Sequence, residues 1–242
     1  MIFRQYFDRA VTSLLAIVFL AFALLSFGYA QYFDRLFIIF LLVLILFNIS
    51  KANIVSIAII FLLERFFEEV VFFFSTYLYI KPLIYLLSLW LIKSFWYDSL
   101  IRRVILPTIV ICITCEVYWY LTNYSAPRIH SYIAMLMLNI ITRHLIFLRV
   151  PLFKQLQALT LIRNIVSQPI TQTPVDLPLY SIAMINILVV VAMIAEYLIR
   201  HLTPLESLFV YNLYSEFIHL LSAVTLFFIV NFIVKSNYKI NA

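Results

Sequence analysis

Four charged residues interrupt one bilayer-length apolar stretch: Glu64, Arg65, Glu68 and Glu69. We call them the charged face, because a helix places all four within about 140° of its circumference. An ionised side chain near the bilayer centre costs at least ~2.5–3.5 kcal/mol. Arg65 can pair with Glu69 or Glu68, which leaves two carboxylates that must hold protons or meet cations from other helices. The candidate cations are Lys93, Arg143, His144 and His219.

A second polar set lies in the last apolar segment, at Asn212, Glu216 and His219, and we call it the polar stripe. Ser215 and Ser222 fall on the same face, within about 120°. Glu216 and His219 are three residues apart and can hydrogen-bond directly or share a proton or a metal ion. Helices with one polar face bury these faces against each other. We therefore expect the charged face and the polar stripe to lie close together or to line one cavity.

Three interpretations of the charged face are open. It could clamp helices together and so fix packing or assembly, which is the interpretation we favour. It could instead handle ions or protons. Alternatively, the span could be broken here, with the charges at a surface. For the polar stripe we favour packing against neighbouring helices over ion handling.

Cys112 and Cys115 have the C-x-x-C spacing and are followed by Glu116. Redox-active thiols need a helix N-terminus or a nearby cation that stabilises the thiolate. These two cysteines lie instead inside an apolar segment, beyond Pro107, and the sequence has no further cysteine for exchange. We interpret them as buried apolar side chains, and we expect neither a metal nor another cofactor.

The composition indicates a membrane protein. Of 242 residues, 65% are hydrophobic and 12% are charged, whereas soluble domains have ~45–50% apolar and ~25% charged residues. A soluble core could not bury this much apolar surface, so lipid is the expected solvent. The net charge of +6 comes from Lys and Arg in connecting segments. This is typical of contact with anionic headgroups on one membrane side rather than with nucleic acid.

Windows of about 20 residues predict an all-α integral membrane protein with about eight transmembrane helices in one bundle, a single domain over residues 1–242. The predicted spans are 10–29, 36–50, 53–80, 83–97, 104–121, 129–148, 179–199 and 205–234. With eight spans, 12 of the 17 Lys and Arg residues are cytoplasmic, 4 are outside and Arg65 is within the membrane, as the positive-inside rule requires. Seven spans, with 83–97 re-entrant, would lose this bias. We expect a multi-pass protein of the cytoplasmic (inner) membrane with both termini cytoplasmic.

The sizeable polar connection covers residues 149–178. Its apolar residues between 152 and 167 fall mainly on one helical face, which predicts a helix lying in the cytoplasmic interface. Prolines, threonines and glutamines in 167–178 predict an extended loop after this helix. Arg149, Lys154 and Arg163 give the connection a basic surface on which a partner could dock.

The sequence contains no catalytic motif, so we do not expect an enzyme. With one glycine, Gly28, it lacks a phosphate-binding loop, a nucleophile elbow and a dinucleotide fingerprint. The favoured function is a membrane-embedded structural, assembly or sensor subunit. It would form homo-oligomers or dock other membrane subunits through its intramembrane polar faces and its basic loop. The alternatives are an ion- or proton-conducting channel component that uses the intramembrane carboxylates, and an intramembrane enzyme acting on a lipid or a peptide.

Overall fold

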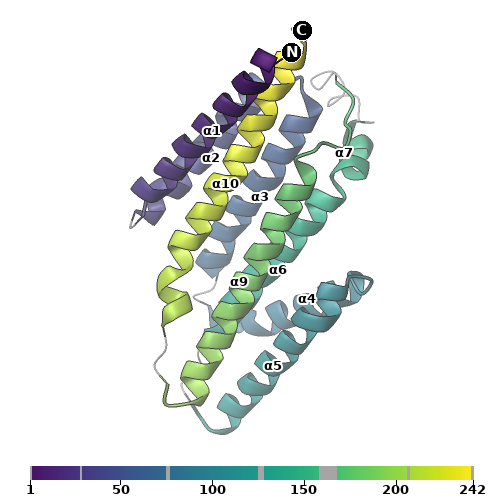
Figure 1. Cartoon of the computed structure of the whole chain (residues 1–242). Helices are drawn as coiled ribbons and strands as arrows, with labels where there is room; N and C mark the ends of the chain where they lie inside the picture. Colours follow the sequence, from purple (N-terminus) through teal and green to yellow (C-terminus); the bar gives the residue numbers. More distant parts are fainter. Residues whose placement is uncertain are drawn as a thin grey trace. The chain divides into compact units, whose positions relative to one another are not determined.

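Helices make up most of the part of the chain that the structure describes. The computed structural model describes residues 2–27, 29–74, 77–124, 128–157, 168–205 and 208–240, and no strand occurs in these ranges. A 3₁₀ turn, η1 (Leu78–Ile80), precedes the helix α4 (Lys81–Ser94). A π-helical turn, η2 (Ile101–Ile105), runs directly into the helix α5 (Leu106–Leu121). The elements in Figure 1 are α1 (Ile2–Leu25), α2 (Ala30–Phe47), α3 (Ala52–Phe74), η1 (Leu78–Ile80), α4 (Lys81–Ser94), η2 (Ile101–Ile105), α5 (Leu106–Leu121), α6 (Ile129–Phe147), α7 (Arg149–Gln157), α9 (Asp176–Leu202) and α10 (Phe209–Ile240).

Four of the described helical segments are long and apolar enough to cross a membrane: Ile101–Leu121, Ile129–Phe147, Asp176–Leu202 and Phe209–Ser236. A shorter apolar segment covers Ala10–Leu25. The prediction of an all-α protein with helices that can cross a membrane is thus confirmed at this level. The count of eight stays a prediction. One reason is that α3 carries four charges, and another is that the 14 residues of α4 span about 21 Å, less than the ~30 Å hydrocarbon core.

The second helix begins earlier than the sequence predicts. α2 starts at Ala30 rather than at residue 36, so Asp34 and Arg35 lie inside it. Hydropathy excludes charged residues from a span, whereas the backbone continues in helix wherever such residues find partners. The predicted span 53–80 is likewise divided, between α3 and the 3₁₀ turn η1. Pro82 lies in the first turn of α4, where its missing N–H is tolerated.

The polar connection is more helical than predicted. α7 covers Arg149–Gln157, the first part of the predicted interfacial helix, and residues 158–167 lie outside the described ranges. α9 begins at Asp176, inside the predicted extended loop. The irregular part of that loop within the described residues is therefore short, from Gln168 to Val175.

The chain forms two compact units built from interleaved segments. The first unit contains Met1–Arg65, Thr142–Met184 and Ser215–Ala242, and the second contains Phe66–Ile141 and Ile185–Tyr214. Helices α3, α6, α9 and α10 contribute residues to both units. Neither unit is a continuous stretch of sequence, so each depends on contacts between distant segments.

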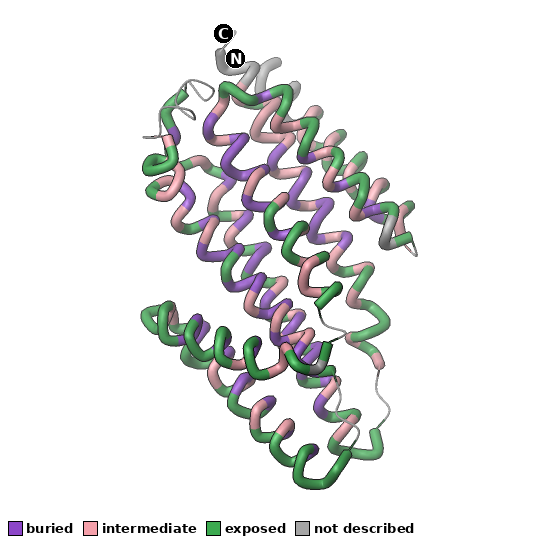
Figure 2. Tube along the Cα trace, turned by 180° about the vertical axis from the view of Figure 1, so that it is seen from behind, coloured by how far each residue is buried: buried purple, intermediate pink, exposed green. Residues whose placement is uncertain are grey.

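In the first unit, α1, α2 and parts of α3 and α10 run side by side (Figure 1). The hydroxyl of Thr12 on α1 donates a hydrogen bond of 3.2 Å to the side-chain oxygen of Asn231 on α10. The part of α3 in this unit is mostly buried, whereas α1 is mostly exposed or half-buried (Figure 2). The buried core includes Phe33, Phe37, Leu41, Phe61, Leu179 and Leu226.

The second unit has its own apolar core, in which Trp119 is buried. Large apolar side chains are nevertheless exposed on the outer faces of its helices, for example Trp90 on α4 and Val110 on α5. Such surfaces are typical of helices that face lipid rather than water. The core includes Ile109, Trp119, Ile133, Leu136, Ile187 and Ile194.

Candidate functional site

Arg65 joins three helices of the first unit. One guanidinium nitrogen lies 3.4 Å from a carboxylate oxygen of Asp34 on α2. Another donates a hydrogen bond of 2.5 Å to the hydroxyl of Ser222 on α10. The guanidinium carbon also lies 5.0 Å from the centre of the Phe37 ring, within the range of a cation–π contact. The side chain is 12% exposed, so protein groups rather than solvent surround its charge.

His219 lies one helical turn before Ser222 on α10 and is buried. Its ring stacks on the Phe33 ring of α2, with 4.4 Å between the centroids and 25° between the planes. The charged groups that act electrostatically on this ring are Asp34, Arg65 and Glu216. We call Asp34, Arg65, His219 and Ser222 the Arg65 cluster.

The Arg65 cluster contains a direct contact between the charged face and the helix that carries the polar stripe. The other members of the charged face are placed differently. Glu64 is buried in the first unit, whereas Glu68 is half-buried and Glu69 is exposed in the second. A single cavity lined by all four charged-face residues stays a prediction.

The members of the polar stripe are also divided between the two units and differ in burial. His219 is buried and Glu216 is half-buried in the first unit, where the hydroxyl of Ser215 donates a hydrogen bond of 3.1 Å to the Glu216 carboxylate. Asn212 is exposed in the second unit. The structure therefore brings His219, rather than the whole stripe, to Arg65.

Asp34 is the residue of this cluster that sequence reasoning missed. It belongs to a pentapeptide, Gln-Tyr-Phe-Asp-Arg at residues 31–35, that also occurs at residues 5–9. An acidic residue just before an apolar segment looks like a loop residue at the lipid–water boundary. The signal that could have found it is the need of Arg65 for a carboxylate at the same depth on a neighbouring helix.

Arg149, at the start of α7, is 1% exposed and forms a second polar centre in the first unit. All five guanidinium N–H groups donate hydrogen bonds, so its donor capacity is filled. Two of them form a bidentate pair with the Asp176 carboxylate, at 3.0 and 2.7 Å. The other three reach the side-chain oxygen of Asn53, the hydroxyl of Ser56 and the carbonyl of Thr171, at 3.2, 2.8 and 3.0 Å.

The Arg149 contacts fasten the irregular segment 168–175 to three helices. Asn53 on α3 also accepts a hydrogen bond from the backbone N–H of Thr171, at 3.0 Å. Thr173 donates to the Asp176 carboxylate through both its N–H and its hydroxyl, at 2.9 and 3.0 Å. This network is why the loop has one defined path even though its sequence is rich in turn-forming residues.

The basic surface expected on this connection is accordingly smaller than predicted. Arg149 does not present its charge at the surface, because its guanidinium is enclosed by acceptors. Lys154 on α7 is exposed. Arg163 lies outside the described residues.

Lys81 and Glu116 form an ion pair in the second unit. The Lys81 ammonium group lies 3.2 and 3.1 Å from the two carboxylate oxygens of Glu116. The side chains are 15% and 16% exposed. The pair joins the first residue of α4 to α5, so the carboxylate that follows the C-x-x-C spacing has a cation beside it.

Cys112 and Cys115 are both free thiols and both buried. Among the residues that the structure describes, no group of three or more His, Cys, Asp and Glu side chains could hold a metal ion. The thiols pack in the apolar core beside Ile109 and Trp119.

No protein-family model, curated protein or solved structure matches the chain. A proposal for its function therefore rests on its own side chains. Arg65, Lys81 and Arg149 all serve the same purpose, since each places a cation beside a carboxylate on another helix. Chemically, these arrangements hold helices together.

Proposed function

We propose that the protein is a membrane-embedded assembly subunit, a helical scaffold that binds partner membrane helices. The observation that carries this proposal is the use of charges as contacts between helices. Arg65 links α3 to α2 and α10, and Lys81 links α4 to α5. In lipid, where apolar contact alone gives little driving force, packing and polar contacts of this kind decide which helices associate.

The part of α3 in the second unit offers a surface for such a partner. Glu69 is exposed there, and Phe66 and Phe73 lie one turn before and after it on the same helical face, both exposed. An exposed carboxylate between phenylalanine rings is costly in lipid. A partner helix with a basic or hydrogen-bonding side chain would remove this cost and bury the rings. The partner is a second copy of the chain or another membrane subunit.

The finer topology belongs to the same proposal. We propose eight spans in the cytoplasmic (inner) membrane, with both termini cytoplasmic, because this arrangement places 12 of the 17 basic residues on one side. Exposed Lys154 would then lie on the cytoplasmic face, where a soluble partner or anionic lipid could contact it. Reporter fusions after Ser50 and after Ala242 should both report the cytoplasm.

The test is the native mass of the protein in mild detergent, measured by light scattering. The double variant Glu68→Gln/Glu69→Gln and the single variant Glu69→Gln are compared with the wild type. Glu216→Gln is the matched control, because it also removes one carboxylate from a long helix but lies in the first unit. A wild-type oligomer that becomes a monomer in both Glu69 variants, but not in the control, supports the proposal. A wild-type monomer, or an unchanged mass in all variants, contradicts an interface between copies of this chain at this face.

A second candidate function is a proton-conducting component. The observation that favours it is the position of His219, whose ring is influenced by Asp34, Arg65 and Glu216 and whose Nδ1 makes no hydrogen bond with the described residues. A relay needs such a titratable group between carboxylates. Proton flux into liposomes that is lost in His219→Gln, with unchanged mass in the Glu69 variants, would favour this function over the scaffold.

A further inference from the structure

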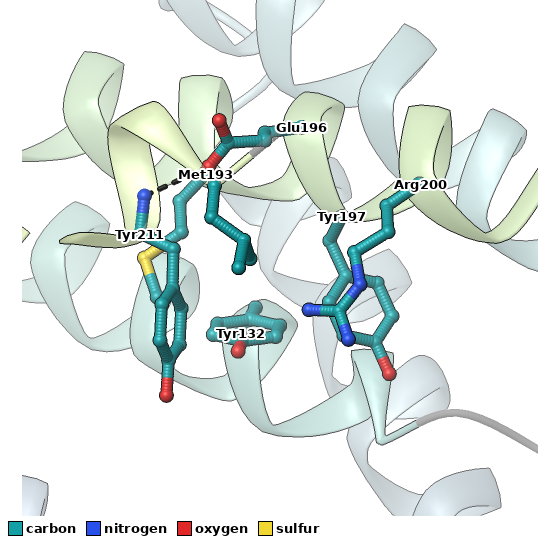
Figure 3. A pocket seen from close by; sticks show the side chains of 7 residues that line it. Tyr132, Met193, Glu196, Tyr197, Arg200 and Tyr211 are labelled. Carbon is teal, nitrogen blue, oxygen red and sulfur yellow. Dashed lines mark hydrogen bonds between the residues drawn. The ribbon is translucent and has the colours of Figure 1, made fainter. Parts of the chain in front are cut away.

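The second unit contains a cavity of about 180 Å³ between α6, α9 and the start of α10. Figure 3 shows it from close by. It is smaller than the ~300–1,000 Å³ typical of sites for drug-sized ligands, which suits a compact polar group. Its lining residues are Tyr132, Met193, Glu196, Tyr197, Arg200, Leu208 and Tyr211.

The two charged residues of the lining, Glu196 and Arg200, have opposite signs and both lie on α9. The Glu196 carboxylate accepts hydrogen bonds from the backbone N–H groups of Val210 and Tyr211, at 3.0 and 2.8 Å, which fixes it against the start of α10. Arg200 is exposed and lies one helical turn further along α9. In Figure 3 its guanidinium lies beside the Tyr197 ring, away from the Glu196 carboxylate.

Three tyrosine rings line the cavity together with these two charges. The rings of Tyr132 and Tyr197 lie 5.1 Å apart between centroids, and the Tyr211 ring faces the cavity from the other side (Figure 3). Tyrosine faces attract ammonium groups, and several rings beside a carboxylate form a cage for such a cation. Each tyrosine also carries a hydroxyl that can donate to an anion.

The cavity lies where lipid headgroups are found if these helices cross a bilayer. Arg200 is two residues from the end of α9, Tyr132 is three residues after the start of α6, and Tyr211 is two residues after the start of α10. All three helices contain segments long and apolar enough to cross a membrane. The polar residues of the lining are therefore within about two turns of the helix ends, at headgroup depth.

We propose that this cavity binds a zwitterionic ammonium–phosphate headgroup. The ammonium group lies over the tyrosine rings beside Glu196, and the phosphate lies at Arg200. Glu196 would repel a simple anion and Arg200 a simple cation, whereas a zwitterion pairs with both at once. The apolar residues Met193 and Leu208 line the part where the glycerol backbone and acyl chains continue.

Native mass spectrometry of the full chain tests the proposal, with equimolar phosphatidylcholine and phosphatidylglycerol added in detergent. We expect one phosphatidylcholine to stay bound per chain, in preference to phosphatidylglycerol. Arg200→Gln removes the charge-assisted contact and should weaken retention about tenfold or more. Tyr211→Ala, an exposed position, should weaken it as well. Arg128→Gln is the matched control, because Arg128 is an exposed arginine close to the start of α6 that does not line the cavity.

Circular dichroism of each variant confirms that a loss of lipid is not a loss of fold. Preferential retention of phosphatidylglycerol by the wild type would overturn the proposal, as would equal losses in Arg200→Gln and Arg128→Gln. A parallel arm uses soluble glycerophosphocholine without bilayer lipid. Its retention would mean that the same site captures a soluble ester, whereas retention of phosphatidylcholine alone would identify the membrane as the source.

Discussion

Asp34 and Arg65 face each other across the hairpin of α2 and α3, 3.4 Å apart. Each lies thirteen residues from the helix end that borders the turn, Phe47 for α2 and Ala52 for α3. Thirteen residues of helix span about 20 Å. In an antiparallel hairpin, equal separations from the turn keep two residues level, so the pair neutralises two charges at one depth. The carboxylate that pairs with Arg65 of the charged face thus comes from α2, the other helix of the hairpin.

Asp34→Asn should lower the free energy of unfolding by about 1–3 kcal/mol, because it removes the carboxylate beside a largely buried guanidinium. The measurement is the midpoint of thermal unfolding in detergent, monitored by fluorescence-detected size exclusion. Arg35→Gln is the control, since Arg35 is the next residue and is exposed. Adding Arg65→Gln to Asp34→Asn should restore part of the loss. Equal midpoints for Asp34→Asn and the wild type would mean that the pair contributes nothing.

Arg149→Lys should destabilise the first unit by about 2–4 kcal/mol although the charge is kept. An ammonium group has three donors and no planar fork, so it cannot replace the bidentate contact with Asp176 and the three further hydrogen bonds. Hydrogen exchange should also become faster at Thr171 and Thr173, whose N–H groups depend on this network. Lys154→Gln, which changes an exposed cation of the same helix, should leave both stability and exchange unchanged.

Lys81→Gln should destabilise the second unit by about 2–4 kcal/mol, because Glu116 would keep its charge in a mostly buried position. The reversed pair Lys81→Glu/Glu116→Lys should recover most of this loss if the two groups act through their mutual attraction. Trp119 is fully buried in this unit, so its fluorescence during titration with sodium dodecyl sulfate reports the unfolding. A reversed pair that is as unstable as Lys81→Gln would show that local packing, rather than charge, dominates.

Cys112 and Cys115 should react with a maleimide only after unfolding, because both thiols are buried. A cysteine introduced by Ser99→Cys is the positive control, since Ser99 is exposed and lies just before the apolar segment that contains the two cysteines. The ratio of labelling rates before and after addition of sodium dodecyl sulfate gives the result. Rapid labelling of the native cysteines would indicate an accessible dithiol, as redox chemistry requires.

The sequence by itself predicts lipid as the solvent of this protein and determines its secondary structure. Its apolar runs are too long and too frequent for a water-soluble core, and in lipid every backbone polar group must be satisfied within a helix. This reasoning gives the helices over 129–147 and 106–121 almost to the residue. It also identifies Arg65 as a residue that needs partners, because the cost of a buried charge is independent of the fold.

The partners of these charges were decided by tertiary structure alone. Sequence spacing relates Arg65 to Glu68 and Glu69 on its own helix, whereas Asp34 and Ser222 are 31 and 157 residues away. The same holds for Arg149. Its sequence context predicts an exposed basic residue, whereas in the fold its guanidinium pairs with Asp176, 27 residues further along the chain. The helical period can be read from one segment. A contact between segments depends on hairpin register and helix packing, which the local pattern does not contain.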